Sequence, residues 1–534
     1  MSLKDLFIRR ERARFAAGGI DRRQFITSLV AAGVVLPTAM TMASEVMAQT
    51  PKKGGTYRMG IAHGSTTDNV DPATYENGFS VNYGWAWGNC LMTANSKGEL
   101  VGDLAESVES SDGKVWTAKL KKGVTFHNGK SLDADDVIAS IQHHLGEDSK
   151  SAAKGVIGGV ESMKKEDANT VVFTLKTPDA DFPYILSDYH LLIMPAADGK
   201  VDATSAIGTG PYKSDRYEPG VRAEMSRFDG YHDSDAAHFD EVLMLSIIDA
   251  TARQQALLSG DVDAIDNVDP KTVDLLARAP IINILETTGT QHYTFPMRVT
   301  SDPFTNLDLR NALKLAVNRK ELVDKILLGH GTVGNDHPIG ANQPFHADLP
   351  QREFDPEKAA ELYKKSGHSG TIQLSASNAA FAGAVDAAEL IAASAKQAGI
   401  DVQVVREAED GYWSNVWNKK GWCACYWSGR PTVDWMYRSG YVDDIEWNDT
   451  DWRTQDGADE FNKLVREARG EVDQTKRAEL YRQTQEILRD KGGALVPMFA
   501  NYIHGLSKKV STGESVSASS EFDGNKSTQR WWFS

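Results

Sequence analysis

The chain has few cysteines, fewer basic than acidic residues, and no long apolar run beyond its N-terminal segment. Its three cysteines, Cys90, Cys423 and Cys425, cannot form a disulfide framework for 534 residues, and they lack the paired spacing of a structural zinc site. The formal net charge of −16 disfavours nucleic acid, and no basic patch in the mature region offsets it. We therefore expect a soluble protein of two or more domains, held together by packed cores.

Catalytic motifs are also absent. The chain contains no GxxxxGK[ST], HExxH or GxSxG motif. Residues 329–334 (GHGTVG) match GxGxxG, but they follow a predicted helix instead of a strand, so we expect a loop there. The adjacent His143 and His144 face different directions on a helix and cannot share a metal. The sequence thus predicts no enzyme activity, no metal and no cofactor.

The first 48 residues resemble a secretion signal. Arginines precede an uncharged segment that begins at Gln24, and small residues follow up to Ala48. Residues 21–26 (DRRQFI) are similar to the twin-arginine motif, which directs folded proteins out of the cytoplasm. Polar residues interrupt the apolar segment and argue against a membrane anchor. We expect export to the periplasm by the twin-arginine machinery, with cleavage near Ala48.

The mature chain alternates β-rich runs with helical patterns, which indicates a mixed α/β fold. Apolar residues recur every three or four positions over 134–145, where Asp133 supplies a capping residue, and again over 308–328. Pro356 begins a helix that runs to about Ser366. We also predict helices over 380–398, 457–469 and 474–490, strands over 115–120, 171–175, 401–405 and 494–500, and a loop over the Ser/Gly-rich residues 511–520.

Several separated motifs resemble those of the extracytoplasmic solute-binding proteins of ABC importers, of the peptide/nickel type (family 5). Residues 207–212 (IGTGPY) match the GTGPY signature of that family. Residues 309–319 (LRNALKLAVNR) and 355–359 (DPEKA) are similar to two of its helix motifs. Three further segments resemble its first strand, the following loop and another helix: 54–58 (GGTYR), 70–72 (VDP) and 133–140 (DADDVIAS). The motifs stand in the family's order and cover nearly the whole mature chain.

The resemblance implies a two-lobe α/β fold of the periplasmic binding protein kind, type II-like, with a ligand cleft between the lobes. By position, lobe I would comprise residues 50–92, 208–290 and 499–534, with 93–207 as its extra subdomain, and lobe II would comprise 291–498. The chain would cross between the lobes near residues 289–293 and 498–502. Such a protein closes around its solute because contacts to both lobes favour the closed form.

Tryptophan is concentrated in one part of the chain. Seven of the twelve tryptophans lie between Trp413 and Trp452, and indoles suit stacking on rings or sugars, although most of them pack in cores. Residues 422–434 (WCACYWSGRPTVD) resemble the ligand-contacting strand and loop of the family. The predicted ligand contacts there are Trp422, Cys423, Ala424, Cys425, Trp427, Arg430 and Asp434, together with Glu76, Asn77 and Gly78 of a first-lobe loop.

Oligopeptide-binding relatives have a similar WCA-x-Y run, in which x is an aspartate that pairs with the peptide's α-ammonium group. The matching residue here is Cys425, or Trp427 in a second alignment, and neither can balance a buried ammonium. Arg430 instead offers a planar guanidinium for a carboxylate or phosphate, or it forms a structural salt bridge with an acid such as Asp434. Alternatively, Asp434 or Glu76 replaces the missing carboxylate and restores an ordinary peptide receptor.

The resemblance implies the substrate-binding component of an ABC transporter: a periplasmic monomer that captures a peptide-like or other medium-sized organic solute and delivers it to a membrane permease, with separate ATPase subunits. The missing aspartate favours a blocked peptide, an opine-like conjugate or an oligosaccharide over free-amino peptides. A secreted hydrolase is the alternative of a different class, although the sequence places no carboxylate pair for it. A sensing or chaperone role would share the fold, and metal or haem capture lacks a His or Met cluster.

Overall fold

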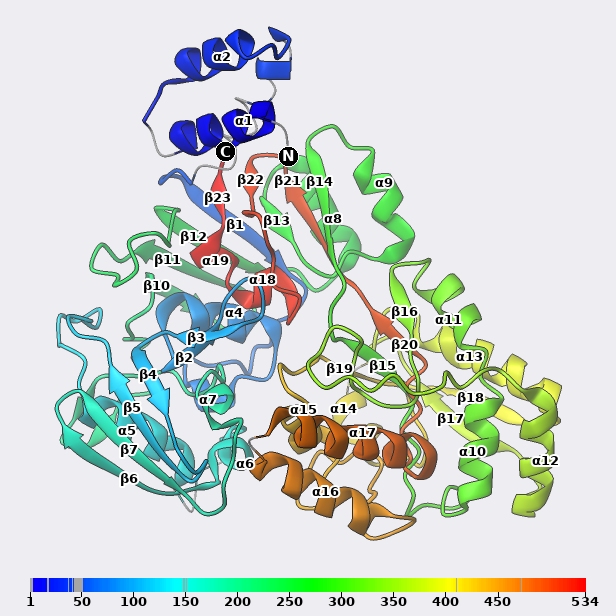
Figure 1. Cartoon of the computed structure of the whole chain (residues 1–534). Coiled ribbons are helices and arrows are strands. Elements are labelled where there is room, and N and C mark those ends of the chain that lie inside the picture. Colours follow the sequence, from blue (N-terminus) through cyan, green and yellow to red (C-terminus); the bar gives the residue numbers. More distant parts are fainter. Residues whose placement is uncertain are drawn as a thin grey trace.

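The computed structural model of the protein describes residues 3–16, 19–36, 38–40, 42, 51–146, 149, 151–409, 411–471 and 473–534. Beyond two N-terminal helices, α1 (Leu3–Ala16) and α2 (Arg22–Ala31), these residues form two lobes built on separate sheets (Figure 1). Within the described ranges, no helix combines the length and apolarity needed to cross a membrane. The predicted cleavage site near Ala48 lies outside the described residues.

Lobe I is built on a seven-stranded sheet that joins distant parts of the chain. Its order is β10 (Tyr212–Glu218), β11 (Arg222–Arg227), β12 (Glu241–Ser246), β1 (Thr56–Ile61), β13 (Ala264–Ile265), β21 (Tyr502–Ser507) and β14 (Ile282–Thr287). β1 runs parallel to β12 and β13, whereas β21 runs antiparallel to both of its neighbours. Outside the inserted segment described next, the α-helices of this lobe are α4 (Gly78–Trp87), α8 (Ala250–Ser259), α9 (Val273–Ala277), α18 (Glu521–Asn525) and α19 (Ser527–Arg530).

A second, antiparallel sheet belongs to the segment between β1 and β10. Its order is β4 (Ala105–Glu109), β5 (Val115–Leu120), β7 (Thr170–Leu175) and β6 (Val160–Asp167), accompanied by α5 (Ala134–Leu145), α6 (Lys154–Ile157) and α7 (Phe182–Ile185). Trp116 and Phe173 of this sheet share one continuous core with Tyr57 and Trp87 of lobe I. The inserted segment therefore packs as part of lobe I. Three short pairs complete the lobe: β2 (Met92–Ala94) with β3 (Leu100–Gly102), β8 (Ala196–Ala197) with β9 (Lys200–Val201), and β22 (Val510–Ser511) with β23 (Trp532–Phe533).

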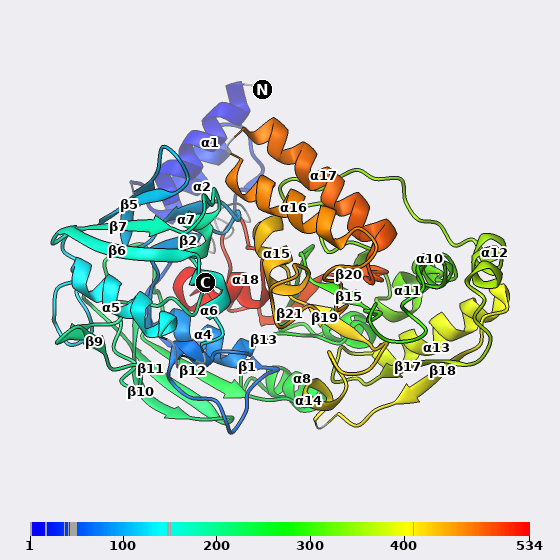
Figure 2. The ribbon, with the colours of Figure 1, turned by 90° about the horizontal axis from the view of Figure 1, so that it is seen from below.

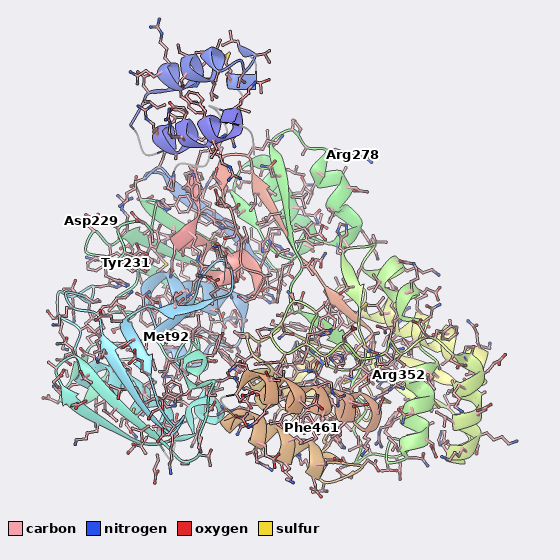
Figure 3. The ribbon with its side chains drawn as sticks, in the orientation of Figure 1. Met92, Asp229, Tyr231, Arg278, Arg352 and Phe461 are labelled. Atoms are coloured by element: carbon pink, nitrogen blue, oxygen red, sulfur yellow. The ribbon has the colours of Figure 1, made fainter. Side chains whose placement is uncertain are left out.

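Lobe II has a four-stranded sheet with a core on each face. Its order is β16 (Gly331–Val333), β20 (Met498–Ala500), β15 (His292–Thr294) and β19 (Cys425–Trp427). One core contains α10 (Leu307–Leu315), α11 (Arg319–Ile326), α12 (Pro356–Ser366), α13 (Ala384–Ala395), α14 (Tyr412–Asn415) and the parallel pair β17 (Ile372–Ala376) and β18 (Val402–Arg406). The other contains α15 (Val433–Gly440), α16 (Ala458–Gly470) and α17 (Gln474–Lys491). Figure 3 shows Phe461 within this second core and Met92 within lobe I.

Most of the predicted elements are confirmed, and the helices with strong end signals are the most accurate. Asp133 accepts from the Asp136 N–H while the Asp136 carboxylate accepts from the Asp133 N–H, which fixes the start of α5. The predicted helices at the positions of α12, α16 and α17 are confirmed to within a residue or two. The strands at the positions of β5, β7 and β18 are also found.

Four predictions of local structure were wrong in detail. The helix predicted over 308–328 is two helices, because Asn318 caps α11 by accepting from the Glu321 N–H at 3.2 Å. The helix predicted over 380–398 is shorter, since α13 begins only at Ala384. Residues 331–333 of the glycine-rich loop pair with β20 as an edge strand, and of the strand predicted over 494–500 only β20 is regular.

Candidate functional site

The chain passes between the two sheets at residues 288–291, which join β14 to β15, and at Asn501, which joins β20 to β21. Two glycines show how closely the segments meet. A Cβ atom on Gly289 would lie 2.2 Å from the ring of Tyr502, and one on Gly429 would lie 1.6 Å from the Thr290 hydroxyl. The loop that follows β19 is therefore seated directly on the first crossing.

Three tyrosines stand around the crossings. Tyr293 of β15 and Tyr426 of β19 are direct partners across two antiparallel strands, so their side chains share one face of the sheet. The ring of Tyr293 also stacks on Phe381, with centroids 4.0 Å apart. Burial raises the pKa of Tyr293, Tyr426 and Tyr502, so each is a neutral hydrogen-bonding group near pH 7. These three tyrosines, together with Arg430 of the loop after β19 and Glu521 at the start of α18, are called the interlobe site.

Arg430 brings a positive charge to the interlobe site and forms no ion pair with any described carboxylate. Its Nε donates to Ser439 Oγ at 3.1 Å, and its Nη1 donates to the carbonyl oxygens of Ser428 (2.9 Å) and Gly429 (3.3 Å). Burial by itself would raise the pKa of Asp188 in lobe I, but His190 and, more weakly, Arg430 hold it below its ordinary value. The guanidinium therefore acts across the lobe boundary.

The salt bridge suggested between Arg430 and Asp434 is not formed. Asp434 is 1% exposed, and its Oδ1 accepts from Arg469 Nε at 3.0 Å. Its Oδ2 lies 3.4 Å from Arg438 Nη1. These two arginines occupy the carboxylate, so the alternative in which Asp434 replaces the missing aspartate is not supported by the geometry.

Three of the predicted ligand contacts lie deep in lobe II. Trp422 is 1% exposed, and its Nε1 donates to the Phe295 carbonyl oxygen at 3.0 Å. Cys423 and Ala424 are buried in the same core, beside α10–α13. Their contact with a ligand stays a prediction, and the packing gives each of them a structural role.

Cys425 and Trp427 point to the opposite face of the sheet from Tyr426, into the core beneath α15–α17. Trp427 Nε1 donates to Asp449 Oδ2 at 3.1 Å, and Trp417 Nε1 donates to the same oxygen at 3.4 Å. Burial raises the pKa of Asp449 to about 6, although these hydrogen bonds oppose the shift. Strand alternation thus leaves Tyr426, which sequence reasoning did not select, on the face shared with Tyr293.

The predicted first-lobe residues precede α4. Asn77 caps this helix by accepting from the N–H groups of Phe79 (3.0 Å) and Ser80 (3.2 Å). Gly78 lies against the ring of His63, where a Cβ atom would approach to 3.0 Å. Glu76 is exposed. The structure gives Asn77 and Gly78 clear local roles, and ligand contact by all three residues stays a prediction.

A buried ion cluster joins the lobes at a second place, where α15 contacts α6 (Figures 1 and 2). Asp179 lies 2.7 Å from Arg438 Nη1, and Asp181 lies 2.8 Å from Arg477 Nη2. The Ala180 N–H donates to the Arg469 carbonyl oxygen at 2.8 Å. The interlobe ion cluster comprises three acids and three arginines: Asp179, Asp181, Asp434, Arg438, Arg469 and Arg477. Its formal charges balance.

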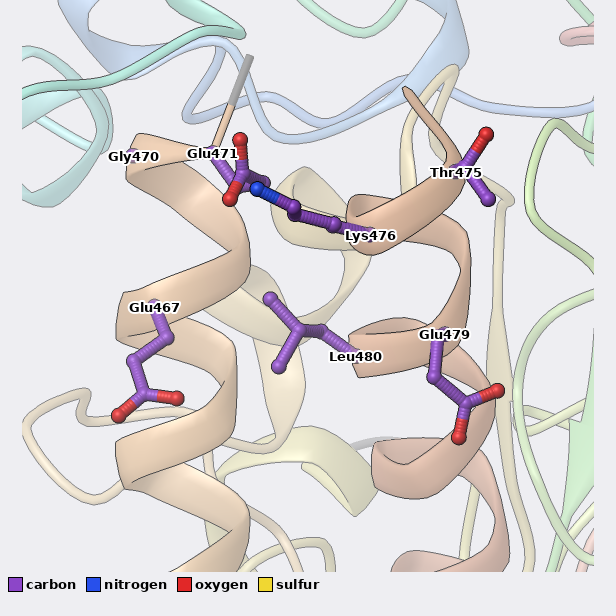
Figure 4. A pocket seen from close by; sticks show the side chains of 7 residues that line it. All are labelled: Glu467, Gly470, Glu471, Thr475, Lys476, Glu479 and Leu480. Carbon is purple, nitrogen blue, oxygen red and sulfur yellow. The ribbon is translucent and has the colours of Figure 1, made fainter. Parts of the chain in front are cut away.

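A pocket of about 690 Å³ lies between α16 and α17 (Figure 4). Its lining is largely exposed and charged, and Leu480 is its one large apolar side chain. All of its lining residues belong to lobe II, whereas a solute that favours closure must contact both lobes, so we do not place the solute here. Among the described residues, no group of three or more His, Cys, Asp or Glu side chains could hold a metal ion.

Two lobes joined by paired chain crossings, with aromatic and charged side chains gathered at the boundary, define a two-lobe α/β binding protein with an inserted subdomain. The model of the bacterial extracellular solute-binding proteins, family 5 Middle, matches residues 99–448. The chain belongs to this family and is therefore a solute-binding protein that acts outside the cytoplasm. The predicted family and fold class are confirmed.

The chain is similar to several solute-binding proteins over most of their length. The chain is 26% identical over 426 residues to Di/tripeptide-binding protein 1 of Pseudomonas aeruginosa (strain UCBPP-PA14), covering 73% of this chain and 78% of that one. The fold of the present chain matches that of the PBP AgaA from A. tumefacien R10 in complex with agropinic acid, with a TM-score of 0.78 and 22% identity, covering 90% of this chain and 99% of that one. It also matches DppA from Helicobacter pylori in complex with the peptide STSA, with a TM-score of 0.78, 20% identity, and coverage of 90% and 98%.

Proposed function

We propose that the protein captures a medium-sized organic acid between its lobes and delivers it to an ABC permease. The observation that carries this proposal is Arg430: its guanidinium stands at the lobe crossing, and among the described residues it bonds only to a hydroxyl and two carbonyl oxygens. A guanidinium held in this way keeps its Nη2 group for a carboxylate, while the bonds to Nε and Nη1 fix its orientation. The tyrosines beside it supply flat apolar faces and neutral hydroxyl groups for the rest of the solute.

Short peptides, blocked peptides and opine-like amino-acid conjugates all carry such an acid. The relatives support both kinds of solute, since one is named for di- and tripeptides and a structural neighbour is in complex with agropinic acid. An oligosaccharide has less support, because Trp422 and Trp427, which suggested sugar stacking, are buried in the cores of lobe II.

Calorimetry with the dipeptide Ala-Phe and its C-terminal amide tests the role of Arg430, because the amide removes only the acid. We expect the wild type to prefer the acid, and Arg430→Gln to abolish that preference at a cost of about 2–5 kcal/mol in binding the acid. Arg430→Lys keeps the charge but loses the planar fork, so it should fall between the two. Equal affinity of the wild type for acid and amide would contradict the proposal.

The export route and the lobe limits belong to the same proposal. We infer that the twin-arginine machinery exports the folded precursor to the periplasm, that the signal is removed near Ala48, and that the mature monomer meets permease and ATPase subunits. Arg22 and Arg23 begin α2, and the Asp21 side chain accepts from the Gln24 N–H at 2.8 Å. The proposed crossings near residues 289–293 and 498–502 are supported by the places where the chain changes sheet, at 288–291 and at 501.

A further inference from the structure

Glu521 is a buried carboxylate beside the lobe crossings. It is 9% exposed, and its Oε2 accepts a hydrogen bond from the Ser520 hydroxyl at 2.8 Å. No described Lys, Arg or His nitrogen forms an ion pair with it. Removing an ionised carboxylate from water without a counter-charge costs free energy. The position of Glu521 is therefore not explained by the stability of the fold.

The backbone around Glu521 is held in an unusual conformation. Phe522, Asp523, Gly524 and Asn525 all have positive φ values, of 49°, 62°, 67° and 62°. For residues with a side chain this left-handed conformation costs roughly 1–2 kcal/mol each. The surrounding contacts hold it in place: the Phe522 N–H donates to His504 Nε2 at 2.8 Å, and Asp523 Oδ1 lies 3.1 Å from Arg530 Nη1. Glu521 is thus presented by a fixed segment.

That segment lies against the chain crossings. Tyr502 donates its hydroxyl to the Ser519 carbonyl oxygen at 3.4 Å, and a Cβ atom on Gly289 would lie 3.0 Å from the Ala518 carbonyl oxygen. After burial, the charge of Glu521 is the next cause that raises the pKa of Tyr293, Tyr426 and Tyr502. The carboxylate therefore acts on tyrosines of both lobes.

Arg430 does not neutralise Glu521 directly, but the two charges act on the same tyrosines. Arg430 lowers the pKa of Tyr426 and Tyr502, whereas Glu521 raises it. His504 cannot serve as the counter-ion, because its Nε2 accepts the Phe522 N–H and therefore carries no proton. Burial also lowers the pKa of His504 to about 4.

We propose that Glu521 binds a protonated amine of the solute, at the interlobe site that also holds the unpaired guanidinium of Arg430. The inference rests on the proposed function and deepens it: the solute is a zwitterion, with its acid at Arg430 and its amine at Glu521. Glu521 then takes the part that sequence comparison assigned to the aspartate missing at Cys425, from a segment almost 100 residues away in the chain.

Three matched probes separate the two charges: Ala-Phe, N-acetyl-Ala-Phe, which lacks the amine's charge, and Ala-Phe amide, which lacks the acid's charge. By calorimetry at pH 7 we expect Glu521→Gln to weaken Ala-Phe binding by about tenfold or more while leaving N-acetyl-Ala-Phe unchanged or tighter. Glu514→Gln removes an exposed acid of the same segment and should leave the binding of all three probes unchanged.

A readout without ligand tests whether Glu521 is instead a structural partner. Removal of an isolated buried charge should raise the unfolding temperature of the ligand-free protein in Glu521→Gln and not in Glu514→Gln. A lower unfolding temperature in Glu521→Gln would overturn the inference. Equal effects of Glu521→Gln on Ala-Phe and N-acetyl-Ala-Phe would overturn it too, whereas the proposed function fails separately if acid and amide bind alike. If none of the three probes binds, both the proposed function and the role of Glu521 are overturned for peptide-sized solutes.

Discussion

The interlobe ion cluster should hold the lobes in contact, and removing its lobe I acids should separate them. Asp179→Asn with Asp181→Asn deletes the lobe I partners of Arg438 and Arg477, at 2.7 and 2.8 Å, and leaves Arg438 only Asp434 of its own lobe, at 3.4 Å. Breaking a buried pair by removing one partner costs about 3–5 kcal/mol. Both arginines regain water when the lobes part, so the cost of the lost pairs destabilises only the conformation in which the lobes are in contact. We take the lower limit of this cost, about 3 kcal/mol, for the double variant. This corresponds to a roughly hundredfold fall in the contacting population.

Hydrogen exchange of the Ala180 N–H measures this contact, because that group donates across the lobe boundary to the Arg469 carbonyl oxygen. We expect about hundredfold faster exchange in the double variant, with a larger radius of gyration in small-angle scattering. Asp135→Asn is the matched control, since its pair with Lys165 (2.6 Å) lies on the surface of the same subdomain, with the aspartate side chain 59% exposed. Unchanged protection of Ala180 in the double variant would refute the reasoning.

Two further predictions concern other parts of the chain. Folding raises the pKa of Asp449 from 3.8 to about 6, so the stability that its protonated carboxyl contributes is present below about pH 4 and is lost as the pH rises through 6. Asp449→Asn should therefore be more stable than the wild type at pH 8, by up to about 3 kcal/mol in chemical denaturation. Equal stability of the two proteins at pH 8 would contradict the raised pKa of Asp449. Arg22→Lys with Arg23→Lys should leave the precursor in the cytoplasm by cell fractionation, whereas Arg9→Lys with Arg10→Lys should not; normal periplasmic levels of the first variant would point to ordinary secretion.

Much of the fold could be predicted because its signals are local. The capping residues Asp133 and Asp355 fix helix starts through hydrogen bonds a few residues along the chain, and the structure contains both bonds. The single helix predicted over 308–328 was wrong because the apolar spacing continues through Asn318, whereas in the structure Asn318 caps a second helix. Periodicity reports which face is buried, but it does not report where the backbone turns.

The charged groups of the site were harder to predict because tertiary structure brings them together. Glu521 lies at the end of a Ser-rich stretch without periodic pattern, and only the left-handed backbone after it reveals a built position. The interlobe ion cluster combines residues from 179 to 477, whose charges look like ordinary surface charges in the sequence. Strand alternation does separate Tyr426 from Trp427 in the sequence, but it cannot say which face meets the other lobe.

The helix α15 carries part of the interlobe ion cluster and is bonded to the interlobe site through Arg430. The Arg430 Nε donates to Ser439 Oγ in the last turn of α15, at 3.1 Å, and Ser439 Oγ donates to the Trp435 carbonyl oxygen of the same helix at 2.8 Å. Arg438, one residue before Ser439, carries the pair with Asp179. A solute held by Arg430, as proposed above, would be connected through Ser439 to the helix that presents the ion cluster to lobe I. Because a ligand shifts an equilibrium only through its differential affinity for the two states, this connection gives the solute a route by which binding at the crossings favours contact between the lobes.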